Sequence, residues 1–136
     1  MWQKFMELAR QSAKEIEILT HRIANGGKDW SPSGPKVHTP NVSSPTERAA
    51  IMEMTVVAQL EAERDEHIAR VGMALAAIQA VREQVGQAEG DVLEMFYIDG
   101  FLTWEIANEL SLTVDGVFYR KRKALRWMDE NLTLPR

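Results

Sequence analysis

The chain contains no cysteine, which excludes disulfides and thiolate metal sites. Its three histidines, His21, His38 and His67, lie too far apart in the sequence to form one ligand set. Long hydrophobic runs are also missing, because no segment approaches the ~20 apolar residues of a membrane span and charged residues interrupt the N-terminal segment. These absences predict a cytoplasmic protein that binds no metal, uses no cofactor and does not contact a membrane.

Catalytic patterns are missing as well. No nucleophile–base pair, phosphate-binding loop or set of paired carboxylates stands out in the sequence. We therefore expect a binding protein rather than an enzyme.

Basic residues are outnumbered by acidic ones: the sequence has 16 Lys and Arg and 20 Asp and Glu, so its formal charge is −4. Their distribution is uneven. From Thr113 to Arg126 five cations stand against Asp115 alone, a net charge of +4, which leaves −8 for the rest of the chain. An acidic body with one compact basic segment directs that segment towards phosphate.

Two long segments have apolar residues at alternating spacings of three and four, which predicts an all-α protein that begins with two amphipathic helices. The first helix should run from Trp2 to Ala24, with Ser12 as the one polar interruption of its stripe, and end at Asn25-Gly26-Gly27, where glycine can adopt the left-handed conformation. The stripe consists of Trp2, Phe5, Ala9, Ile16, Leu19 and Ile23.

Residues 25–45 are rich in proline, glycine and serine and are predicted to form a linker. The second helix then has a clear start, with Ser44 as N-cap, Pro45 as its first residue and Glu47 completing a capping box. It should extend to about Gln84. Its stripe is predicted to consist of Met54, Val57, Ile68, Val71, Leu75, Ile78 and Val85, with Glu61, Arg64 and Arg82 also at stripe positions.

The stripes of residues 1–86 allow two interpretations. They can form the core of a monomeric antiparallel hairpin, or they can join copies of the chain. The second helix is longer than the first by several turns, so after the hairpin has formed part of its stripe stays available to a second copy of the chain or to the C-terminal helices. This excess favours an oligomerisation region and a homodimer or higher homo-oligomer.

Residues 87–136 are predicted to form a compact unit that folds on its own. Its three helices should span Asp91–Ile98, Thr103–Leu110 and Val114 to about Asn131. Thr103 and Thr113 are the expected N-caps of the second and third. Two short helices joined by a tight turn, the second of them basic, have the layout of a helix-turn-helix. One small core is expected from Leu93, Phe96, Ile106, Ala107, Leu110, Val117, Ala124, Leu125 and Met128.

The outer face of the last helix carries the candidate site. An exposed Phe118-Tyr119 pair beside cations would suit contacts with thymine methyl groups or base edges, although either ring could instead pack on the core or on the second helix. The cations could likewise form a solvated helix face that complements the helix dipole. The predicted DNA-contacting residues are Thr113, Val114, Asp115, Gly116, Phe118, Tyr119, Arg120, Arg122, Lys123 and Arg126.

The C-terminal third of the chain resembles region four of bacterial sigma factors, which recognises the promoter −35 element. The resemblance rests on Val92–Gly100, on Glu105-Ile106-Ala107 with Leu110, and on Val117, Arg120 and Ala124-Leu125. It implies base-reading positions at Val114, Asp115 and Tyr119, with Phe118 beside them. Two departures are Ser111 in place of the usual turn glycine and Gly116 inside the recognition helix, where glycine costs up to ~1 kcal/mol of helix propensity.

The order of N-terminal helix, linker, long helix and sigma-like unit also resembles phage and prophage late-gene regulators of the ArpU/RinA type. This resemblance implies a sequence-specific activator of phage late genes in the bacterial cytoplasm, associated with the nucleoid. Its partners would be double-stranded DNA and RNA polymerase, and its operator need not be a −35 sequence. The alternative hypothesis is a phage packaging or structural DNA adaptor of the small terminase kind.

Overall fold

The structure is a computed structural model that describes residues 1–26 and 45–135, apart from the side chains of residues 45–50 and Glu53. Every regular element of these residues is a helix, as the sequence predicts. The elements in chain order are α1 (Trp2–Ala24), α2 (Pro45–Gln84), α3 (Gln87–Leu93), a π-helical turn (Glu94–Ile98), α4 (Thr103–Leu110) and α5 (Val114–Asn131).

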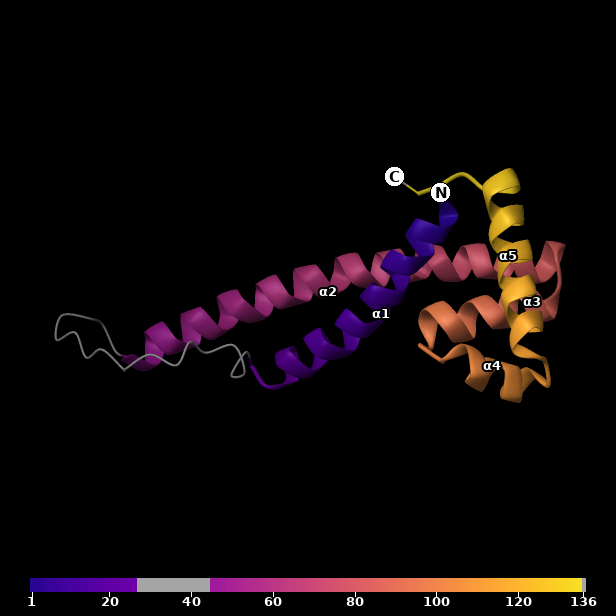
Figure 1. The fold of residues 1–136 in the computed structure, drawn as a ribbon. Coiled ribbons are helices and arrows are strands. Elements are labelled where there is room, and N and C mark those ends of the chain that lie inside the picture. Colours follow the sequence, from indigo (N-terminus) through magenta and orange to yellow (C-terminus); the bar gives the residue numbers. More distant parts are fainter. Residues whose placement is uncertain (27–44, 136) are drawn as a thin grey trace.

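Helices α1 and α2 form an antiparallel pair, and the short helices gather at the C-terminal end of α2 (Figure 1). Ser12 lies in this contact and is fully buried. Its Oγ lies 2.9 Å from Nδ1 of His67 and accepts a hydrogen bond of 2.9 Å from Nη1 of Arg70. The polar interruption of the α1 stripe is therefore satisfied from α2, as a buried hydroxyl requires.

The predicted stripe of α1 is confirmed, and Met6 joins it as a fully buried residue. The predicted stripe of α2 is only half right. Ile68 and Leu75 are 47% and 36% exposed, whereas the positions one residue earlier face α1, with Ala74 fully buried and His67 bonded to Ser12. Alanine fits there because it lies in one core cluster with the bulky Trp2 and Met6 of α1.

The end of α1 also follows the prediction, because Gly26 has a φ of 63° and its N–H donates to the Ile23 carbonyl at 2.9 Å. Helix α2 begins at Pro45 and ends at Gln84, both as predicted. The predicted cap Ser44, the side chain of Glu47 and nearly all of the predicted linker lie outside the described part of the chain.

The first short helix begins at Gln87 and not at Asp91, because Gly90 is a packing residue rather than a helix break. A methyl group at Gly90 would overlap the Arg82 side chain, which crosses α3 to bind Asp91 at 3.1 Å and Glu94 at 2.8 Å. The predicted ranges of α4 and α5 are confirmed.

The predicted N-cap at Thr103 is wrong, since Thr103 is already helical and Leu102 takes the cap position. Leucine has no side-chain acceptor for the helix N–H groups. The first turn of α4 is instead tied down by Glu105, whose carboxylate accepts a 3.0 Å hydrogen bond from the Leu102 N–H.

The apolar residues form two clusters rather than the single small core expected for residues 87–136. A small cluster joins α3, α4 and α5 through Val92, Ile106, Ala107 and Val117. The larger cluster takes Leu93, Tyr97, Ala124, Leu125 and Met128 of the C-terminal region and packs them with residues of α1 and α2. Phe96 and Leu110, also predicted as core, are partly buried, Phe96 against both clusters and Leu110 against the small one. The C-terminal region therefore packs five of its nine clustered buried residues with the hairpin, while α4 packs only in the small cluster.

The start of α1 and the segment after α5 lie close together (Figure 1), and Trp2 links them. Its backbone N–H donates to Oδ1 of Asp129 at 2.9 Å, and its indole N–H donates to the Leu132 carbonyl at 3.2 Å. Because its side chain is only 3% exposed, Trp2 holds α1 firmly against the end of α5.

Within the described ranges, no helix combines the length and the hydrophobicity that crossing a membrane requires.

Candidate nucleic-acid interface

Helices α4 and α5 meet through a tight turn at Ser111. Ser111 adopts the left-handed conformation, with φ 55° and ψ 43°, and it is the only non-glycine residue with positive φ in the described residues. This is the conformation that glycine adopts without strain. The turn therefore keeps the helix-turn-helix geometry at some cost in backbone strain.

The start of α5 is capped as predicted. Oγ1 of Thr113 accepts a hydrogen bond of 3.0 Å from the N–H of Gly116, so one of the orphan donors of the helix is satisfied. A methyl group at Gly116 would lie 3.1 Å from this same oxygen, which is a tight contact. The glycine thus gives the cap room, which partly offsets its low helix propensity.

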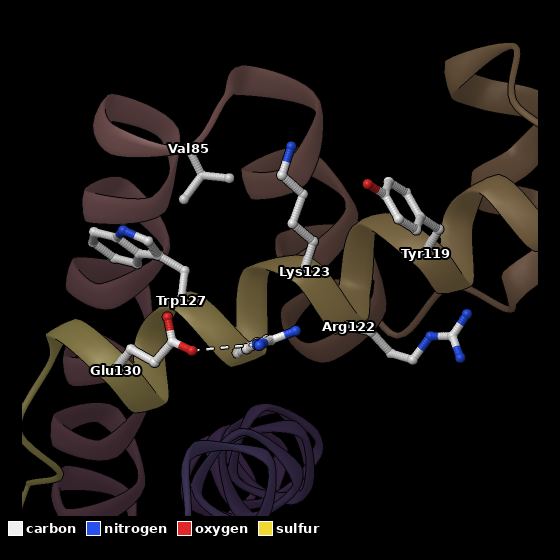
Figure 2. A pocket seen from close by; sticks show the side chains of 7 residues that line it. Val85, Tyr119, Arg122, Lys123, Trp127 and Glu130 are labelled. Atoms are coloured by element: carbon white, nitrogen blue, oxygen red, sulfur yellow. Dashed lines mark hydrogen bonds and ion pairs between the residues drawn. The ribbon is translucent and has the colours of Figure 1, made fainter.

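The first half of α5 presents apolar and aromatic side chains to solvent. Val114, Phe118 and Tyr119 are all exposed, and Tyr119 is the most open of them at 59%. Thr113 and Asp115 are exposed as well, while Gly116 is half-buried. Figure 2 shows the Tyr119 ring standing away from the ribbon of α5. The alternative in which Tyr119 packs into a core is not what the structure shows.

The four consecutive cations of α5 separate into inward and outward groups. Nη1 of Arg120 binds Oε1 of Glu89 in α3 at 3.0 Å, and Nζ of Lys123 lies 3.6 Å from the same oxygen. The Lys121 ammonium instead lies over the Phe96 ring, 4.0 Å from its centroid, while the guanidinium of Arg10 lies 4.3 Å from that centroid. Arg120 and Lys121 are thus engaged within the fold.

The environment of Lys121 differs from that of a surface lysine. Burial lowers the pKa of its ammonium group, the nearby Arg10 lowers it further, and Glu7 acts in the opposite direction. Lys121 is half-buried and is not among the residues that the sequence predicts to contact DNA.

Three cations project from the outer surface of α5. Among the described residues Arg122 has no ion-pair partner, and its side chain leaves the helix on a different side from Lys123 (Figure 2). Arg126 is largely exposed and donates to Glu130 one turn later at 3.2 Å. Exposed pairs of this kind are worth ~0.3–0.5 kcal/mol, so Arg126 remains available to a phosphate.

A hollow of about 490 Å³ lies along this cationic face. It is lined by Val85, Tyr119, Arg122, Lys123, Arg126, Trp127 and Glu130. Figure 2 shows Val85 and Trp127 together at one end and Tyr119 at the other, with Lys123 rising between them. The surface therefore combines an apolar floor with three cations, a phenol and the Glu130 carboxylate, and its excess of cations suits a sugar–phosphate strand.

Some residues of this surface are missing from the sequence-based prediction. Trp127 and Glu130 follow Tyr119 and Lys123 at helical spacing, so the period of α5 is a signal that could have found them. No local pattern assigns Val85 or Glu89 to this surface. Val85 follows the end of α2 and Glu89 lies in α3, and both approach α5 only in the folded chain. Trp104 was also missed. It is 58% exposed in the first turn of α4.

Comparison of the chain with known protein families, curated proteins and solved structures finds no match. The function is therefore inferred from the residues and their geometry.

Proposed function

We propose that this protein binds double-stranded DNA through α5 and acts as a sequence-specific transcription regulator. The observation that carries the proposal is the outer surface of α5, where Tyr119, Arg122 and Arg126 project from a helix held by a helix-turn-helix turn. The N-terminal half of such a helix enters the major groove, and cations farther along it reach the phosphates.

Base contacts in this proposal come from the exposed side chains at the start of α5. Val114, Asp115 and Tyr119 would read base edges, with Phe118 placed for a thymine methyl. Arg122, Lys123 and Arg126 would hold the backbone. Thr113 and Gly116 support the helix start, and Arg120 supports it from behind through Glu89.

The resemblance to phage late-gene regulators of the ArpU/RinA type suggests the biological role. It favours an activator that works in a bacterial cytoplasm, close to the nucleoid, with RNA polymerase as a second partner. Prophage origin is part of the same proposal.

We also propose that the hairpin joins two copies of the chain. Ile68 and Leu75 are exposed in the monomer and lie outside its core, so they are available to a second copy. A dimer would place two copies of α5 on two half-sites and raise the affinity for a palindromic operator.

A second candidate is a phage packaging or structural DNA adaptor. The observation that favours it is the apolar exposure of the hairpin, which an oligomeric assembly would also cover. Selection of bound sequences from a randomised duplex library tests the first proposal. Recovery of one enriched motif supports a sequence-specific regulator, whereas binding without enrichment favours the adaptor. Transcription from a reporter that carries the motif then tests activation.

A further inference from the structure

Glu89 is a buried carboxylate that faces the cations of α5. It is 5% exposed although it carries a charge, and its Oε1 is bound by both Arg120 and Lys123. Its other oxygen fits against Gly86, where any side chain would overlap it. A charge so buried is held by partners, since an unpaired one would be costly.

The pairing takes Arg120 out of the surface that phosphates would meet and leaves the half-exposed Lys123 shared between Glu89 and that surface. Oε1 of Glu89 lies 3.0 Å from Nη1 of Arg120 and 3.6 Å from Nζ of Lys123. Arg122 on the same helix has no acidic partner among the described side chains. The charge that α5 offers to a polyanion is therefore smaller than its sequence indicates. Non-specific DNA affinity depends on that charge, since each neutralised phosphate contributes to the salt dependence.

We infer that Glu89 limits the non-specific DNA affinity of α5 and thereby determines how strongly base contacts decide where the protein binds. The inference rests on the proposed DNA binding and adds a specificity-determining residue outside the recognition helix. Glu89 acts here through Arg120 and Lys123 and touches no base itself.

The test compares Glu89→Gln with wild type on random duplex DNA over a series of salt concentrations. Glutamine keeps the shape and a hydrogen-bond acceptor for Arg120 but removes the negative charge. We expect tighter binding to random DNA and a log–log salt slope steeper by about 0.9 for one added phosphate contact. Asp91→Asn is the matched control, because it removes the same charge from α3 but its partner is Arg82 of α2. Its slope should equal that of wild type.

An unchanged slope for Glu89→Gln would overturn the inference and leave DNA binding itself intact. Absence of duplex binding by wild type and variant alike would overturn the proposed function and the inference together. If Glu89→Gln fails to fold, the salt slopes of Arg120→Gln and Arg122→Gln are compared instead, after circular dichroism has shown that both variants are folded. The slope should flatten for Arg122→Gln and hardly change for Arg120→Gln, and equal losses would contradict the role of Glu89.

Discussion

Replacing Trp2 with alanine tests whether α1 and α5 are joined as the structure shows. The indole is 3% exposed, packs in the larger core cluster and donates to the Leu132 carbonyl. Truncation of a buried Trp costs about 3–5 kcal/mol, because apolar contacts are lost and a cavity remains. The free energy of unfolding of a small domain is about 5–15 kcal/mol, so Trp2→Ala should lose a large share of it.

Trp104→Ala is the matched control, because it makes the same chemical change at a residue that is 58% exposed. Surface substitutions usually stay within about 0.5 kcal/mol. Urea denaturation followed by circular dichroism gives the free energy of unfolding of both variants. If both lose the same amount, the N-terminal helix is not docked on the end of α5 and the shared core is wrong.

The remaining predictions address the turn, a buried phenol, the shared core and self-association. Ser111→Gly should stabilise the protein by about 1 kcal/mol in the same urea assay, because it relieves a left-handed residue; a loss would show that the turn is unstrained. Burial raises the pKa of Tyr97 to about 12 from 10.0 in the unfolded chain, so the unfolded state loses its proton first. Stability should therefore fall as the pH rises from 10 towards 12, by about 2–3 kcal/mol relative to Tyr97→Phe, and parallel pH profiles would contradict this. The shared core reverses the sequence-based expectation that residues 87–136 fold on their own: fragment 87–136 should show no cooperative thermal transition, because the hairpin covers much of its apolar surface, and a cooperative transition would contradict this. Leu75→Asp should sediment as a folded monomer where wild type forms dimers, and a monomeric wild type at high micromolar concentration would refute self-association.

The sequence predicts the helices of this fold well and their packing less well. Caps and breakers such as Gly26, Pro45 and Thr113 act locally, so their effect is visible in the sequence. The register of α2 is different, because Ala74 and Leu75 compete for the inner face and the larger residue is the natural choice. Alanine takes the inner position because the side chains of α1 in the same cluster, Trp2 and Met6, are large. That information lies in α1 and not in the sequence of α2.

In the candidate site, too, the sequence predicts what depends on one helix and misses what depends on its neighbours. Tyr119 and Arg122 lie on the outer face that helical periodicity assigns to them. Neighbouring cations of one run point in different directions, since successive residues of a helix differ by about 100°. Arg120 turns towards Glu89 and Lys121 towards Phe96, and neither partner can be foreseen from the run itself.

Competition binding on selected and random duplexes tests the central claim most directly, with Tyr119→Ala and Arg122→Ala as the two variants. Arg122→Ala should weaken binding to both duplexes alike and flatten the log–log salt slope by about 0.9, because it removes a phosphate contact. Tyr119→Ala should cost roughly 1–3 kcal/mol on the selected sequence and little on random DNA, because it removes a base contact. Equal losses of Tyr119→Ala on the two duplexes, in a protein that remains folded, would show that α5 does not read sequence.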